Sequence, residues 1–70
     1  MAVSYKKLWK LLIDRDMRKK DLCAAAGIRH ASMAKLGKNE KVNTDVLVKI
    51  CTALQCDIGD IMEITDSSNN

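Results

Sequence analysis

The sequence predicts an all-α fold, a compact bundle of five helices built around a helix-turn-helix. Its 70 residues contain no Pro, three Gly, one Trp, one Tyr and no Phe, and this composition favours helices over strands and tight turns. Apolar residues also recur at three- and four-residue intervals along most of the chain, which is the helical period. A chain of this length forms one small domain, so we expect residues 1–64 to fold together and the tail 65–70 to fray.

The first predicted helix spans about residues 5–15, with Ser4 as its N-cap. Its apolar stripe is formed by Tyr5, Leu8, Leu11 and Leu12. Trp9 and Ile13 widen this stripe to about 200°, which is more than one packed face needs. Either this helix packs against two neighbours at once, or Trp9 and Ile13 form part of a contact between two copies of the chain.

The second and third predicted helices, about residues 19–26 and 30–36, have the pattern of a helix-turn-helix. Gly27 supplies a left-handed turn between them, and Cys23 is small enough for the point where the two helices cross. The apolar anchors are Leu22, Ala26, Ile28, Met33 and Leu36. A third helix with a fixed inner face and a free outer face can enter a DNA major groove.

Two more helices complete the predicted bundle. One spans about residues 44–54 behind the N-cap Asn43, and its apolar positions follow the helical period. The other is short, about residues 58–63, and begins at a capping box formed by Asp57 and Asp60.

Charge divides the chain into a basic and an acidic part. Residues 1–42 contain eleven Lys and Arg against four acidic residues, a net charge of +7, while residues 43–70 contain one Lys against five acidic residues, a net charge of −4. The total of +3 hides this division. A basic surface favours a polyanionic partner, and a solvated surface without a partner is the alternative.

Several functions are disfavoured by the same residues. With a single His and so short a chain, no catalytic constellation can be assembled, and we expect no enzyme, cofactor, metal site or small-molecule ligand. No apolar run is long enough for a membrane span. Three cysteines without a C-x-x-C pattern are typical of a reducing cytoplasm. We read them as small core residues, with a redox switch at Cys56 as an alternative.

The chain resembles the Cro and phage-repressor (XRE-type) helix-turn-helix family, whose DNA-binding domain is lambda-repressor-like. The resemblance covers about residues 4–64 and rests on the helix-turn-helix followed by L-x-x-I-x-x-A-L-x-C-x-x-x-D-I at residues 47–61. The strings L-W-K-L-L-I-D-R-D-M, A-K-L-G-K-N-E and C-D-I-G-D-I are most similar to small single-domain VanU-like transcriptional regulators.

The resemblance implies a sequence-specific regulator of transcription, a repressor or autoregulator, that places its third helix in the major groove of double-stranded DNA. Base contacts would be made by His30, Ala31 and Lys35. Phosphate contacts would be made by Lys19, Lys20, Arg29, Lys38 and Asn39. Two copies would pair on a palindromic site, and the candidates for the contact between them are Trp9, Ile13 and Met62. The implied location is the bacterial cytoplasm, at the nucleoid.

Three positions depart from the family pattern. Arg29 precedes the third helix where Ser or Thr is usual, and Arg cannot accept a hydrogen bond from the helix N–H groups. Leu36 replaces a common Trp, and Gly37 replaces the acidic residue that usually follows it. The alternative function is a protein-interaction module, such as an antitoxin or an accessory subunit that acts through another regulator. A thiol sensor is a third.

Overall fold

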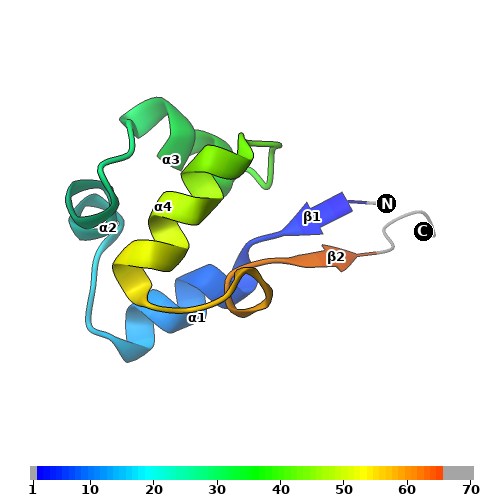
Figure 1. Cartoon of the computed structure of the whole chain (residues 1–70). Coiled ribbons are helices and arrows are strands. Elements are labelled where there is room, and N and C mark those ends of the chain that lie inside the picture. The colour runs from blue at the N-terminus through cyan, green and yellow to red at the C-terminus, as the bar shows by residue number, and fades with distance from the viewer. Residues whose placement is uncertain (1, 66–70) are drawn as a thin grey trace.

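The computed structural model describes residues 2–65, which form four α-helices, one 3₁₀ turn and a two-stranded ribbon (Figure 1). The elements are β1 (Ala2–Ser4), α1 (Lys6–Asp14), α2 (Lys19–Ala26), α3 (His30–Gly37), α4 (Thr44–Leu54), η1 (Ile58–Asp60) and β2 (Glu63–Thr65). In Figure 1, α4 runs through the middle of the helical body, and β1 and β2 extend away from it. None of the helices in this part of the chain has the length and apolar character that crossing a membrane requires.

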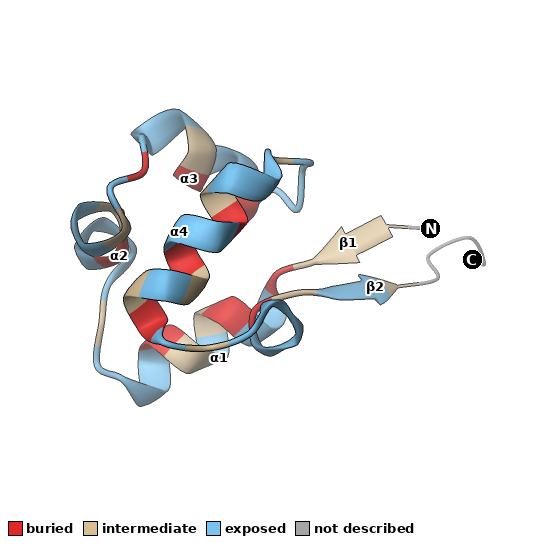
Figure 2. Ribbon diagram, viewed as in Figure 1, coloured by how far each residue is buried: buried red, intermediate tan, exposed pale blue. Residues whose placement is uncertain are grey.

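The core lies around α4 and draws on every helix (Figure 2). The fully buried side chains are Tyr5, Leu8, Leu22, Leu36, Ile50, Leu54 and Ile61. Leu22 and Leu36, two predicted anchors of the helix-turn-helix, are 0% exposed. Burial of such side chains stabilises the fold by about 1.5–3 kcal/mol each. The two helices of the motif are therefore fixed from the inside.

The four longer helices confirm the helical part of the predicted fold, but the expected all-α bundle of five helices is not what the chain forms. The fifth helix, expected over residues 58–63, is a single 3₁₀ turn at Ile58–Asp60. Its predicted capping box is present, because the Asp57 side chain accepts from the Asp60 amide and Asp60 Oδ2 accepts from the Asp57 amide at 3.0 Å. Asp57 Oδ1 also accepts from the Ile58 amide at 2.8 Å. The helix stops because Ile61 turns into the core, where it is 0% exposed, and the chain then runs on as β2.

The ribbon joins the two ends of the described chain. β1 and β2 are antiparallel, with Ala2 opposite Thr65, Val3 opposite Ile64 and Ser4 opposite Glu63. Thr65, where we expected the tail to begin, is thus paired, and residues 66–70 of the expected tail lie outside the described residues. Ser4 belongs to this strand, so the N-cap of α1 is Tyr5 instead. The Ser4 hydroxyl still accepts from the Lys6 amide at 3.3 Å.

All four helices of residues 2–65 end in the same kind of turn. One or two residues after each helix end, the backbone has a positive φ: Asp16 (58°), Gly27 (70°), Asn39 (56°) and Gln55 (53°). The next amide then donates to a carbonyl five residues earlier, at 2.9–3.2 Å: Met17 to Leu12, Ile28 to Cys23, Glu40 to Lys35 and Cys56 to Cys51. This is the Schellman motif, which brings the two side chains flanking the turn together. The sequence predicts it only at Gly27.

Candidate nucleic-acid interface

The third helix has one buried face and one free face. Met33 and Leu36 are 7% and 0% exposed and seat α3 on the core. His30, Ala31 and Lys35, the predicted base-contacting residues, are all exposed on the other side. A helix held in this way can present its outer side chains without changing its own packing.

Four of the predicted DNA-contacting residues surround one hollow between the start of α2 and α3. Its walls are formed by Lys19, Lys20, Cys23, His30, Met33, Ala34, Gly37 and Lys38. Lys19 and Lys20 come from α2, His30 comes from α3, and Lys38 follows the end of α3. The structure therefore brings the cations of Lys19, Lys20 and Lys38 to the same hollow as His30.

Trp9 lies beneath one of these cations. The Lys19 Nζ atom is 4.6 Å from the centroid of the Trp9 ring, which is a cation–π geometry. A Cβ atom built on Gly37 would be 3.9 Å from the same Nζ atom. The indole of α1 and the end of α3 thus hold the ammonium group at the rim of the hollow. Sequence reasoning did not identify this contact, because Trp9 and Lys19 belong to different helices.

Lys35 and Asn39 border a different hollow, on the side of the ribbon. It is lined by Ala2, Val3, Lys35, Asn39, Glu40, Lys41 and Ile64. The Asn39 side-chain oxygen accepts from the Tyr5 amide at 3.0 Å. Asn39 therefore has a structural role at the start of α1, and its side-chain NH₂ group is left to donate elsewhere.

Arg29 lies apart from the other predicted phosphate-contacting residues. It borders a third hollow together with Asn43, at the start of α4, and Lys49. As expected, Arg29 is the N-cap of α3 without a side-chain capping bond. Asn43 is the N-cap of α4, but it also makes no side-chain capping bond. At the start of α2, by contrast, the Asp21 carboxylate accepts from the Arg18 amide at 2.9 Å.

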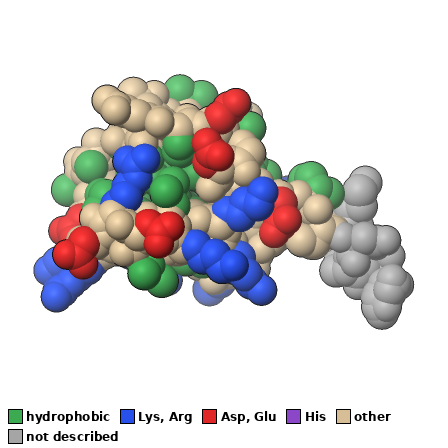
Figure 3. Space-filling view, turned by 90° about the horizontal axis from the view of Figure 1, so that it is seen from below, with side chains coloured by type: hydrophobic (Ala, Val, Ile, Leu, Met, Phe, Trp, Pro, Cys, Tyr) green, Lys and Arg blue, Asp and Glu red, His purple; other side chains and the backbone are tan. Residues whose placement is uncertain are grey.

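The cations of α2 and α3 are not neutralised by the fold. Across residues 2–65 the one salt bridge joins Lys49 and Asp45, at 3.9 Å within α4. On the face below α1, acidic and basic side chains lie side by side (Figure 3). Unpaired cations beside an exposed helix create a positive potential that attracts an anionic polymer.

The predicted dimer residues and the three cysteines differ in how far they are exposed. Ile13 is 75% exposed, whereas Trp9 and Met62 are half-buried and pack against the core. All three cysteines are half-buried free thiols. Burial, together with the adjacent Cys56, raises the pKa of Cys51 to about 11. Residues 2–65 bring together no group of three or more His, Cys, Asp or Glu side chains suited to a metal ion.

Comparison with known proteins gives one family and one solved structure. Residues 7–67 match the Cro/C1-type HTH DNA-binding domain. The crystal structure of the transcriptional regulator VanUg (Form II) is 60% identical in sequence, with a TM-score of 0.85 over 89% of this chain and 83% of that chain. No curated protein matches the sequence.

Proposed function

This chain belongs to the family of Cro/C1-type helix-turn-helix DNA-binding domains, and on that premise we propose that it regulates transcription by placing α3 in the major groove of a specific DNA site. The observation that carries the proposal is the exposed face of α3, formed by His30, Ala31 and Lys35 and flanked by unpaired cations. The similarity to a transcriptional regulator at 60% identity supports it.

We assign direct base contacts to the outer face of α3. The Lys35 ammonium can donate to O6 or N7 of guanine, and the Ala31 methyl can contact the methyl group of thymine. Ala34 is also exposed on this helix, so α3 offers few hydrogen-bonding groups. Part of the specificity would then come from the shape and deformability of the DNA.

Phosphate contacts hold the helix in register. Lys19 and Lys20 stand at the N-terminus of α2, where the helix dipole also favours an anion. Lys38 and the Asn39 NH₂ group would contact the backbone on the other side of the groove, and Arg29 would do so near the start of α4. In this arrangement two copies bind a palindrome and repress transcription by covering the promoter.

The DNA sequence preference is tested by selection from a random duplex library with the purified protein, which reports the site, its symmetry and the half-site spacing together. Lys35→Ala should change the preferred base at one position of each half-site. Lys19→Ala and Lys38→Ala should lower the affinity for every DNA sequence about equally, because phosphate contacts carry no base information. If Lys35→Ala lowered the affinity for all DNA sequences equally, Lys35 would contact phosphate instead of a base.

Lys10→Ala is the matched control, since it removes the same charge from α1. Lys10 borders a hollow formed by α1, the end of α4 and η1, away from α3. The logarithm of the wild-type affinity should fall linearly with the logarithm of salt concentration, with a slope of about −0.9 per phosphate neutralised. Each of Lys19→Ala and Lys38→Ala should reduce that slope by about one, and Lys10→Ala should leave it unchanged. A chain without salt-dependent DNA affinity would favour the antitoxin-like or accessory function.

A further inference from the structure

The turns that end α2 and α4 place a cysteine at the same position but give it different partners. At the end of α2, the Ile28 amide donates to the Cys23 carbonyl at 3.2 Å, and at the end of α4 the Cys56 amide donates to the Cys51 carbonyl at 3.0 Å. The side chains of the two residues joined in this way pack together in a Schellman motif. Cys23 is therefore paired with an apolar side chain, and Cys51 is paired with a second cysteine.

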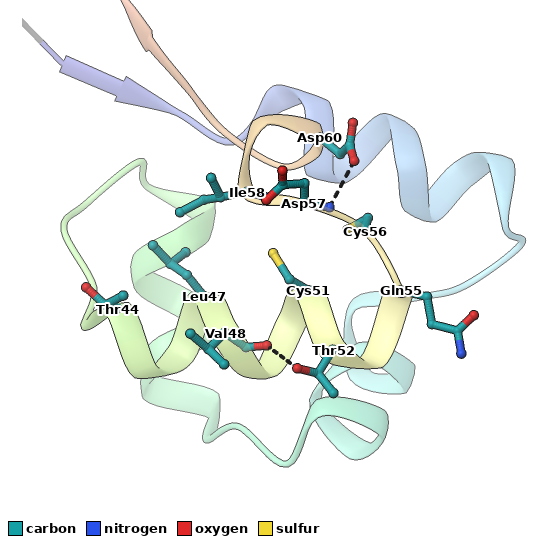
Figure 4. Close-up of a pocket in the computed structure, with 10 residues that line it drawn as sticks. All are labelled: Thr44, Leu47, Val48, Cys51, Thr52, Gln55, Cys56, Asp57, Ile58 and Asp60. Carbon is teal, nitrogen blue, oxygen red and sulfur yellow. Dashed lines mark hydrogen bonds between the residues drawn. The ribbon is translucent and has the colours of Figure 1, made fainter.

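Both cysteines of this second turn line an open hollow on the outside of the molecule. In Figure 4, the Cys51 side chain extends from α4 toward the segment that carries Cys56 and Asp57. Both residues are half-buried and line this hollow, and the neighbouring Cys56 contributes to the raised pKa of Cys51. A small oxidant can thus approach both cysteines from solvent at the same hollow.

We propose that Cys51 and Cys56 are a redox-active dithiol, which a low-molecular-weight disulfide converts reversibly into an intramolecular disulfide. The geometric requirement is that the two Cα atoms lie within about 4.4–6.8 Å with side chains directed toward each other. The backbone hydrogen bond of the turn, from the Cys56 amide to the Cys51 carbonyl at 3.0 Å, holds the two residues beside each other at the end of α4. Cys23 has no cysteine partner among residues 2–65 and remains a thiol.

The reaction proceeds by two exchanges. The Cys56 thiolate attacks one sulfur of the oxidant and expels one thiolate, which leaves Cys56 in a mixed disulfide. Cys51 then loses its proton to solvent, attacks the Cys56 sulfur and expels the second thiolate. The two cysteines together give up two electrons and two protons, and the oxidant is reduced to two thiols. The attack starts at Cys56 because burial and the neighbouring Cys56, Asp57 and Asp60 keep Cys51 protonated at neutral pH.

The wild-type folded protein is sufficient for the test. It is equilibrated in mixtures of oxidised and reduced glutathione, quenched with an alkylating reagent, and analysed by intact mass and peptide mapping. The reduced protein carries three cysteines and should take up three labels. The oxidised protein should take up one label, at Cys23, and contain a Cys51–Cys56 link that dithiothreitol reverses. Separate glutathione adducts on Cys51 and Cys56, or a link to Cys23, would overturn the proposal.

Two variants separate the pair from general thiol reactivity. Cys51→Ser should trap Cys56 as a mixed disulfide with glutathione, because the resolving thiol is absent. Cys23→Ser should form the Cys51–Cys56 link at the same glutathione ratio as the wild type. Loss of the link in Cys23→Ser would contradict the assignment of the disulfide to Cys51 and Cys56. The peptide mapping of the wild-type protein tests the same assignment, so the test does not depend on whether the serine variants fold.

Discussion

Asn39 shows how one side chain can serve both the fold and the proposed site. Its position after α3 requires a positive φ of 56°, which Asn tolerates better than most residues. Its oxygen accepts from the Tyr5 amide, 34 residues away in sequence. The resemblance assigns Asn39 only to a phosphate, because a hydrogen bond to the start of the first helix leaves no local pattern in the sequence.

Substitutions at Asn39 should separate these two roles. Asn39→Asp keeps an acceptor for the Tyr5 amide, so its free energy of unfolding should stay within about 0.5 kcal/mol of wild type. It replaces the NH₂ donor by a negative charge, so DNA affinity should fall about tenfold or more. Urea denaturation and fluorescence anisotropy measure the two quantities.

Asn39→Ala is the complementary variant. It removes the acceptor and places Ala at a positive φ, so it should lower the free energy of unfolding by about 1–2 kcal/mol. If Asn39→Asp binds DNA as tightly as wild type, the side chain of Asn39 does not contact phosphate.

At the scale of elements, the helices could be predicted from the sequence because their signals are local. The bounds of α2 and α4 agree with the prediction, whereas α1 is one residue shorter at each end and α3 is one residue longer at its C-terminal end. The strands could not be predicted in this way. Each has three residues, which is too short for an alternating pattern, and each is stabilised by a partner at the other end of the described chain.

In the candidate site, too, the features set within one segment could be predicted and those set by the packing of different segments could not. The exposure of His30 and Lys35 is set by the helical period of their own segment, so it could be predicted. The position of Lys19 over Trp9 and the separation of Arg29 from Lys38 depend on how helices are placed relative to one another. Neither leaves a signal within a single segment.

The turn between α2 and α3 offers a test at this scale. Gly27 has a φ of 70°, and a Cβ atom built on it would meet nothing within 4 Å. Gly27→Ala should therefore destabilise the fold through backbone conformation alone, by about 1–2 kcal/mol.

Gly59→Ala is the matched control, because Gly59 also has open space around its Cα but no positive φ. Its free energy of unfolding should change by no more than about 0.5 kcal/mol. Equal effects of the two substitutions in urea denaturation would show that the left-handed conformation of Gly27 does not contribute to the stability of the fold.

For the whole molecule, the question is how two copies would meet on a palindrome. Ile13 and Ile64 are exposed apolar side chains, 75% and 62% exposed, on α1 and β2. Exposed apolar residues are candidates for contact between proteins. Of the predicted dimer residues, Trp9 already supports Lys19 and Met62 packs on the core, so Ile13 is the one whose side chain is available.

We expect Ile13→Lys to fold normally and to lose the extra affinity of a full palindromic site over a half-site, measured by electrophoretic shift with both duplexes. Substitution of so exposed a residue should change the free energy of unfolding by no more than about 0.5 kcal/mol. Ile64→Lys is the control and should retain the preference for the full site. The reverse result would place the contact between copies on the ribbon.

The ribbon also has a mechanical consequence. Ala2 and Thr65 are paired at its outer end, so a pulling force applied at these two residues acts across the strands. The hydrogen bonds of an antiparallel pair lie along that direction, and they would open one after another, starting from Ala2 and Thr65. Under tension the ribbon would unzip before any load reached the helical body, and α2 and α3 would keep their arrangement while the ends separated.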